Sequence, residues 1–349
     1  MIALKKINKY RRIIMRALTR NIGRSSSDVY PEIHGEVTIK RVLISRPNDR
    51  LGNLLLVTPL VLEVASTFPD SKIDLFVRGG LAPTLFMNYK NVEHIFQLPK
   101  KPFENIVKYL REWNGLLKNQ YDLVINVDKN SSSGRISTQY AHARFKLFGE
   151  ENRETSLKQT DAEHVAKAPV YYFRNFLTRL GVPVNNKPIP FLDLKLTTAE
   201  IAEGEKILKK LVNNDKKSIC IFTYATGSKR YPAIWWENFY NRLIMQYPQY
   251  NIIEMLPKEN VSQISFKAPT FYSNDLRQIA AVFANTKVFI GADSGIMHLA
   301  SASGVPTVGL FSVTDANRYQ PYNNNSVGIS TNNTDIEESI KILDKILVE

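Results

Sequence analysis

The chain has 349 residues, of which 44% are hydrophobic and 10% aromatic, and these values exclude a disordered protein. Its length allows one large or two medium domains, and its formal net charge of +13 excludes an acidic protein. Its one cysteine, Cys220, excludes an internal disulfide framework and fits a reducing, cytoplasmic setting. Cys220 lies in an apolar run, which predicts a buried side chain and not a nucleophile.

The N-terminal segment 1–27 carries eight Lys and Arg residues and no acid before Asp28. Apolar residues recur there at helical spacing, which predicts an apolar stripe beside a basic face, as in a helix that lies on an anionic membrane. A solvated basic arm is the alternative. We expect no nucleic-acid partner, because no binding motif accompanies the charge. We also expect no signal peptide and no membrane span. The apolar residues of the predicted stripe are Ile7, Tyr10, Ile14, Leu18 and Ile22.

Strand-like and helix-like segments alternate after residue 36, a pattern typical of a parallel sheet covered by helices. Residues 46–53 are expected to form a loop, 152–164 an exposed excursion, and the proline-rich stretch 183–190 a linker. For the first half we predict strands at 38–45, 72–77, 95–97 and 121–127, and helices at 54–68, 103–119 and 168–180.

The second half repeats this alternation. Two Rossmann-like domains, at 36–185 and 190–349, therefore follow an N-terminal arm or interfacial helix at 1–30, with a cleft between their parallel sheets. We predict strands at 218–223, 251–255, 270–272, 287–290 and 307–311, and helices at 198–213, 233–246, 274–284 and from 294.

The segment 288–311 joins two apolar strands through a polar turn that opens a helix. Asp293, Ser294, Gly295 and His298 lie in this turn and the first helical turn. The free N–H groups and dipole of a helix N-terminus attract anions, so the pattern predicts a phosphate site.

Three blocks in this chain resemble glycosyltransferase family 9, the heptosyltransferase-like enzymes of lipopolysaccharide core assembly. The blocks are SRPNDRLGNLLLVTPLVLEVASTFPDSKIDLFV (45–77), FTYATGSKRYPAIWWENF (222–239) and FIGADSGIMHLASASGVPTVGLFSVTDANRYQPY (289–322). The third is the most similar, through its Asp-Ser-Gly-x-x-His core and the later Thr-Asp-x-x-Arg-Tyr-x-Pro. The resemblance extends from about residue 40 to the C-terminus and leaves out residues 1–30.

The resemblance implies an α/β protein of GT-B type. It also implies an ADP-heptose-type donor in the C-terminal domain, a lipid-linked saccharide acceptor in the N-terminal domain, and inversion without a metal or cofactor. A cytoplasmic protein, peripheral on the inner face of the membrane, would fit this activity.

On the donor side, the resemblance matches Lys229 to the family's phosphate-contacting lysine, and Thr223, Thr226 and Ser228 offer hydroxyl donors beside it. An exposed loop lysine is the structural alternative. Asp293 and Ser294 also suit a helix cap, and Gly295 would allow close approach of a ligand. His298 would contact phosphate or acceptor, or pack in the core. Glu259 would bind the ribose hydroxyls.

On the acceptor side, the family places an aspartate directly after the loop glycine, whereas here Gly52 is followed by Asn53. Asparagine is no base at neutral pH, so three interpretations stand. Asp49 acts as the base; or Asn53 orients the acceptor and Asp128 is the base; or the chain is a weak or inactive relative that binds nucleotide or glycan. Residues Arg46, Arg50 and Lys129 are candidates for contacts with acceptor anions.

A dinucleotide-dependent oxidoreductase is disfavoured, because no strand in this sequence continues into G-x-G-x-x-G. The resemblance thus predicts a glycosyltransferase whose donor half carries two of the three blocks. Its catalytic base is the open question.

Overall fold

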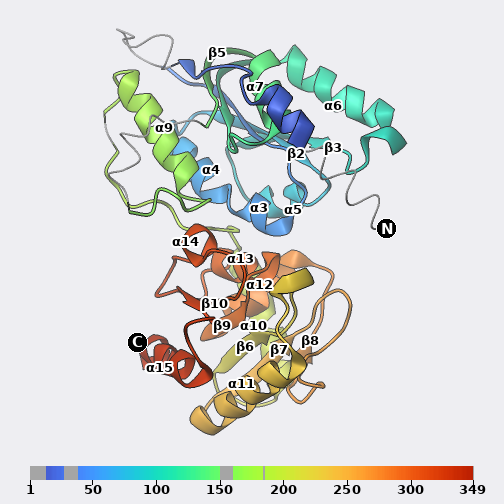
Figure 1. Ribbon diagram of the computed structural model, residues 1–349, viewed down its shortest axis with the longest axis vertical. Helices are drawn as coiled ribbons and strands as arrows, with labels where there is room; N and C mark the ends of the chain where they lie inside the picture. The colour runs from blue at the N-terminus through green and yellow to red at the C-terminus, as the bar shows by residue number, and fades with distance from the viewer. Residues whose placement is uncertain (1–12, 27–37, 150–159, 184, 349) are drawn as a thin grey trace. The chain divides into compact units, whose positions relative to one another are not determined.

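The computed structural model of the protein describes residues 13–26, 38–149, 160–183 and 185–348. The chain divides into two compact units (Figure 1). Within the described ranges, none of the helices has the length and apolar character needed to cross a bilayer. Unit 1 comprises Met1–Asp49, Pro59–Ala162 and Ala166–Pro190, and unit 2 comprises Arg50–Thr58, Glu163–Val165 and Phe191–Glu349.

Unit 1 contains a five-stranded sheet in the order β3-β2-β1-β4-β5, and every neighbouring pair is parallel. The inner strands are buried along almost their whole length, as expected of a parallel sheet that is covered on both faces. The strands are β1 (Arg41–Arg46), β2 (Lys72–Arg78), β3 (Val92–Leu98), β4 (Gln120–Asn126) and β5 (His142–Leu147).

Two helices of unit 1 cover the same face of this sheet. Helix α6 (Ile106–Lys118) packs on Leu43 and Phe76 through its buried side, and Ser45, two residues after Leu43, hydrogen bonds to Ser137 of α7 (Ser132–Tyr140) at 2.6 Å. Further helical elements of the chain are α4 (Thr58–Thr67), α5 (Ala82–Phe86), the 3₁₀ turn η1 (Pro102–Glu104) and α9 (Ala168–Arg179).

The single helix predicted over 54–68 is wrong, because the structure has two helices there. Helix α3 (Leu51–Leu55) begins three residues earlier than predicted, and α4 starts at Thr58. Pro59 lacks the N–H that would continue the ladder to Leu55, and the Thr58 hydroxyl donates to the Leu55 carbonyl at 2.8 Å instead. Gly52 and Asn53, expected in a loop, are therefore helical.

Residues 13–19 form a helix, and the chain after it is anchored on unit 1. The Ser25 hydroxyl accepts a hydrogen bond from the Phe148 N–H at 3.0 Å, and Ser26 accepts one from the Lys146 N–H at 2.8 Å. The buried Arg135 guanidinium donates to the Ile22 carbonyl at 2.7 Å. Residues 22–26 are thus part of the fold of unit 1, whereas residues 1–12 of the predicted basic segment lie outside the described residues.

Unit 2 contains a six-stranded parallel sheet in the order β11-β10-β9-β6-β7-β8. Strands β6, β9 and β10 are buried at every position, and burial raises the pKa of the Cys220 thiol, as suits a packing residue. The strands are β6 (Ser218–Phe222), β7 (Asn251–Met255), β8 (Thr270–Phe271), β9 (Val288–Ala292), β10 (Thr307–Phe311) and β11 (Val327–Ser330).

Helices cover both faces of this sheet. Trp236 and Phe239 of α11 share one core with Ile219, Ile290 and Leu343. Contacts of α10 with α12 and of α12 with α13 build a further helical layer of unit 2. The helical elements of this unit are α3, α10 (Thr198–Val212), η2 (Gly227–Lys229), α11 (Ala233–Gln246), α12 (Leu276–Ala284), α13 (Gly295–Ala302), α14 (Ala316–Tyr319) and α15 (Ile336–Val348).

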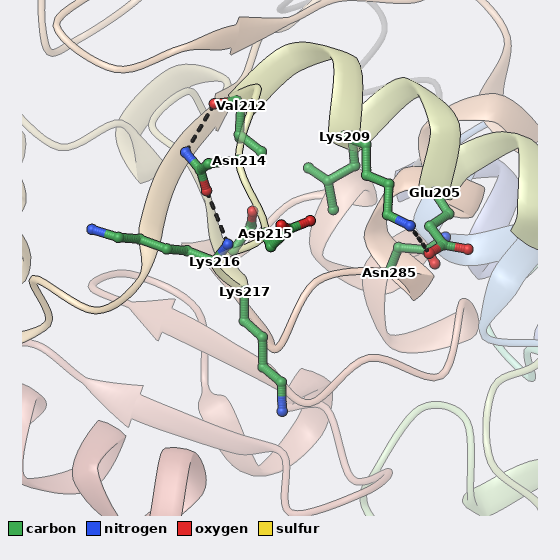
Figure 2. Close-up of a pocket in the computed structure, with 10 residues that line it drawn as sticks. Glu205, Lys209, Val212, Asn214, Asp215, Lys216, Lys217 and Asn285 are labelled. Atoms are coloured by element: carbon green, nitrogen blue, oxygen red, sulfur yellow. Dashed lines mark hydrogen bonds and ion pairs between the residues drawn. The ribbon is translucent and has the colours of Figure 1, made fainter.

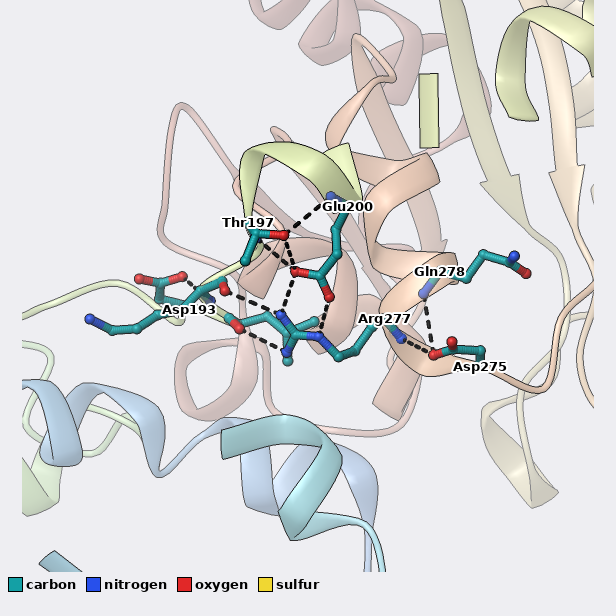
Figure 3. A network of polar contacts seen from close by, with 8 residues as sticks. Asp193, Thr197, Glu200, Asp275, Arg277 and Gln278 are labelled. Atoms are coloured by element: carbon teal, nitrogen blue, oxygen red, sulfur yellow. Dashed lines mark hydrogen bonds and ion pairs between the residues drawn. The ribbon is translucent and has the colours of Figure 1, made fainter. Parts of the chain in front are cut away.

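A buried arginine joins the segment before α10 to helices α10 and α12 of unit 2 (Figure 3). Arg277 of α12 donates to both carboxylate oxygens of Glu200, at 2.5 and 3.0 Å, and to the Leu194 and Lys195 carbonyls. Glu200 also completes a capping box with Thr197 at the start of α10. The Arg277 guanidinium lowers the pKa of Glu200 to about 2.

The predicted class, α/β with two parallel sheets, is confirmed. Elements α5, α7, β5, α14, β11 and α15 were not anticipated from periodicity.

Candidate functional site

The carboxyl end of the unit 2 sheet brings together the loops that follow β6, β7 and β9. Parallel strands end on the same side of a sheet, so these loops converge although their sequence positions lie up to 70 residues apart. They carry the predicted donor-side residues.

Lys229 and Asp293 form an ion pair that joins the loop after β6 to the loop after β9. The Asp293 side chain is only 6% exposed, whereas Lys229 is 38% exposed. The carboxylate thus holds the lysine in place while part of the lysine side chain still faces solvent. The predicted loop lysine and the predicted cap aspartate meet here as partners.

Glu254 of β7 is a buried carboxylate that sequence reasoning missed. It accepts hydrogen bonds from the Thr223 hydroxyl at 2.5 Å and the Ser262 hydroxyl at 2.6 Å. Thr223 in turn accepts the Gln263 N–H at 3.1 Å. Burial raises the pKa of Glu254, against the effect of these hydrogen bonds. A charged residue inside the apolar strand NIIEM was the signal in the sequence.

Glu254 therefore fixes the loop after β6 to the loop after β7. Thr223 is buried as one of its partners, while Thr226 and Ser228 are exposed beside Lys229. Glu259 is exposed in the loop after β7. The hydroxyls near Lys229 and the Glu259 carboxylate are accessible to a ligand, whereas the Thr223 hydroxyl is already engaged.

Ser294, and not Asp293, caps α13. Its hydroxyl accepts the Met297 N–H at 3.3 Å, which satisfies one of the free donors of the first turn. The remaining N–H groups and the helix dipole favour an anion at this end.

His298, one turn into α13, is buried against α3. A Cβ placed on Gly52 would lie 2.7 Å from the His298 Cδ2 atom, and one on Gly295 would lie 3.1 Å from the Leu51 Cβ. Both glycines therefore allow α3 to pack closely on α13. Burial lowers the pKa of His298, although the Asp293 carboxylate opposes this, so the ring is neutral near pH 7.

A short segment that sequence reasoning assigned to an excursion contributes a second buried histidine to unit 2. His164 Nε2 lies 2.9 Å from the Gln320 carbonyl, and the ring packs edge-on against Tyr322. The adjacent Val165 N–H donates to the Arg318 carbonyl at 3.0 Å. Part of the predicted excursion, residues 152–159, lies outside the described residues.

The acceptor-side residues of unit 1 lie at the carboxyl end of its own sheet. Arg46, nearly buried, donates to the Asp128 carboxylate at 2.5 Å, and Asp128 also accepts the Asn130 N–H. The Asp128 carboxylate is thus already occupied by Arg46 and a backbone N–H, which leaves it less accessible to an acceptor hydroxyl. Within the described ranges, the Asp49 carboxylate has no hydrogen bond or ion pair.

Asp49 is half-buried and lies beside the turn after β2. A Cβ placed on Gly79 would lie 3.2 Å from the Asp49 Cβ and 3.0 Å from the Lys100 Cε. Arg50 and Lys129 are exposed, whereas Asn53 is half-buried on α3.

A shallow pocket lies away from these residues, where α10 ends and β6 begins (Figure 2). Its Lys209 is paired with Glu205 at 2.7 Å, and Asn214 is held by the Val212 carbonyl at 2.9 Å. It lies at the amino end of the sheet, opposite the loops described above.

Comparison with known proteins gives a consistent result. The family profile for glycosyltransferase family 9 (heptosyltransferase) matches residues 109–345. Lipopolysaccharide heptosyltransferase 3 of Escherichia coli K12 is 23% identical over 79% of this chain and 84% of its own length. A family 9 glycosyltransferase structure from Veillonella parvula superposes with a TM-score of 0.68 at 17% identity, covering 90% of this chain and 99% of that one. The E. coli heptosyltransferase WaaC with ADP gives a TM-score of 0.62 at 19% identity, covering 88% and 99%.

Proposed function

The chain belongs to glycosyltransferase family 9, the heptosyltransferases, and from this premise we propose that it transfers heptose from ADP-heptose to a lipid-linked saccharide of lipopolysaccharide or a related surface glycan. The transfer inverts the anomeric carbon and uses no metal. The observation that carries the proposal is the Lys229–Asp293 pair beside the capped start of α13.

The donor side supports diphosphate binding. When the bond from the anomeric carbon to the phosphate oxygen breaks, negative charge develops on the diphosphate. The Lys229 ammonium, oriented by Asp293, and the first N–H groups of α13 supply fixed positive charge for it. Exposed hydroxyls at Thr226 and Ser228 add donors. The similar WaaC structure contains ADP, which supports adenosine as the nucleoside. For the ribose contact we propose Glu259, which is exposed in the loop after β7.

On the acceptor side, we propose Asp49 as the base. Its carboxylate makes no hydrogen bond within the described ranges, whereas Asp128 is held by Arg46. The acceptor hydroxyl loses its proton to Asp49 as its oxygen attacks the anomeric carbon. Asn53 keeps the position of the family's aspartate as an amide that donates or accepts a hydrogen bond.

We also propose a peripheral location on an anionic membrane surface, with contact through residues 1–27. Within the described part of this segment, Ile14 and Leu18 are 56% and 69% exposed beside Arg16 and Arg20. Apolar side chains next to cations are typical of interfacial helices.

A second candidate function rests on Asn53. If Asp49 takes no proton, the chain binds nucleotide or glycan without turnover. The two functions differ in transfer and agree in ADP binding, so both must be measured.

The test is a thermal-shift screen against ADP-, UDP-, GDP- and CMP-sugars, followed by transfer to lipid-linked saccharides with and without EDTA. We expect ADP and ADP-heptose to raise the melting temperature and transfer to persist in EDTA. Binding without transfer to any acceptor supports the second function, and no response to ADP-heptose removes the first.

A further inference from the structure

The outer side of α6 in unit 1 is apolar where a helix at a protein surface is ordinarily polar. Its buried side packs on the sheet through Trp113 and Leu116. The outer stripe consists of large apolar side chains at positions one helical turn apart, together with one from the preceding turn η1. Their exposed fractions are 88% for Phe103, 55% for Ile106, 78% for Val107 and 59% for Leu110.

The segment that carries this stripe has a net positive charge. The segment 100–118 contains five basic residues and two acidic ones. Both acids are engaged by cations of the same segment: Glu104 accepts from Lys101 at 2.8 Å, and Glu112 lies 3.6 Å from Arg111 and accepts the Gln97 N–H at 3.0 Å. The segment keeps a surplus of three positive charges. The basic residues are Lys100, Lys101, Lys108, Arg111 and Lys118.

The stripe starts close to the proposed acceptor side. Helix α6 follows β3, whose carboxyl end lies with those of β1 and β4 because the sheet is parallel. Lys100 and Asp49 both lie beside Gly79, since a Cβ placed there would be 3.0 Å from the Lys100 Cε and 3.2 Å from the Asp49 Cβ. Phe103, the first residue of the apolar stripe, therefore follows only three residues after Lys100, which lies near the proposed base.

We infer that the turn η1 and the outer side of α6 form a lipid-docking surface that binds an anionic bilayer and holds the carboxyl end of the unit 1 sheet at the headgroups. Apolar side chains enter the interface while the basic side chains of this segment meet anionic headgroups. A second copy of this chain would bring its own positive charge to the contact, whereas an anionic bilayer supplies the opposite charge. The inference deepens the proposed function, on which it rests, because a lipid-linked acceptor is presented at such an interface.

The test is flotation of the full-length protein with phosphatidylcholine vesicles, with and without phosphatidylglycerol. We compare wild type with the double variant Val107→Ser/Leu110→Ser. A matched control is Ile234→Ser/Met245→Ser on α11 of unit 2, whose side chains are 64% and 69% exposed. We expect the α6 variant to bind anionic vesicles about tenfold more weakly and the control to bind like wild type. A charge variant, Lys101→Gln/Lys108→Gln, should lose the preference for anionic lipid.

Equal vesicle binding by wild type and the α6 variant would overturn the inference. So would a concentration-dependent dimer that the α6 variant abolishes, since the stripe would then be an interface between copies. The same preparations are titrated with ADP. An unchanged melting temperature shows that the α6 variant is folded, and absence of ADP binding in wild type marks a failure of the proposed function instead.

Discussion

The Lys229 ammonium is held by the Asp293 carboxylate, so a residue of the loop after β6 is oriented by a residue 64 positions later in the chain. The pair gives the loop lysine a defined position before any ligand is bound, which is how a cation lowers a barrier most effectively. It is the centre of the proposed donor site.

Replacing this lysine should reduce transfer strongly. We expect Lys229→Ala to lower kcat by about 10²- to 10³-fold, the loss typical of removing one preorganised donor. Steady-state transfer kinetics and ADP calorimetry measure the effect. Lys267→Ala, which removes an exposed lysine paired with Glu237, is the control. Unchanged kinetics in Lys229→Ala would exclude the lysine from the reaction.

If Asp49 is the base, substitutions at Asp49 and Asn53 should differ in their effect on kcat. Asp49→Asn should lower kcat by about 10²- to 10⁴-fold, because the acceptor hydroxyl loses its proton acceptor. Asn53→Asp should change kcat little, since the base is already present. A large gain from Asn53→Asp would instead identify Asn53 as the cause of weak activity.

Asp128→Asn separates a structural role from a catalytic one. The substitution removes the negative charge that pairs with the nearly buried Arg46, so we expect the melting temperature to fall. If kcat falls by orders of magnitude while the melting temperature is unchanged, Asp128 is the base and Asp49 is not.

Close packing of α3 on α13 predicts that Gly52 tolerates no side chain. Gly52→Ala gains helix propensity, but its Cβ would lie 2.7 Å from the His298 ring, so we expect a net loss of about 1–3 kcal/mol in unfolding free energy. Gly80→Ala is the control, because a Cβ there meets nothing within 4 Å. The double variant with His298→Ala should recover part of the loss, and strictly additive effects would argue against the contact.

The Glu200–Arg277 pair predicts a loss of stability in acid. The folded-state pKa of Glu200 is lowered from 4.5 to about 2, so the folded protein binds this proton less readily than the unfolded chain. The stabilisation is present above pH 4.5 and disappears as the pH falls towards 2. Glu200→Gln should flatten the unfolding free energy over this window. Glu205→Gln, on the same helix and in an exposed ion pair with Lys209, should change the slope less, because solvent screens this pair.

The N-terminal segment requires a truncation chosen from the structure. Deleting residues 1–27 removes the hydroxyls of Ser25 and Ser26 and the carbonyl that binds Arg135, and we expect this to destabilise unit 1. Deleting residues 1–12 leaves these contacts intact. It should weaken binding to anionic vesicles while the melting temperature stays the same. Unchanged vesicle binding would remove the proposed role of these residues.

The sequence by itself determined the fold class, because buried parallel strands are apolar runs, as in SICIF, VFIGA and TVGLF. It determined the family as well, through three motifs. It also indicated Lys229 and the turn at Asp293 as separate features. It did not reveal that α3 begins at Leu51 and ends before Thr58. The end of α3 depends on Pro59, which has no N–H for the Leu55 carbonyl, so that this carbonyl accepts from the Thr58 hydroxyl instead.

Only the tertiary structure decided which side chains are engaged and which are accessible. It paired Lys229 with Asp293 and Arg46 with Asp128, left Asp49 without a partner in the described ranges, and buried Glu254 between two loops. Such pairings depend on strands that are adjacent in space and distant in sequence, and periodicity reports only which face of its own element a residue occupies. The same limit applies to α6. Its sequence is apolar enough for a helix buried on all sides, and only the structure shows that the sheet buries just one of its sides.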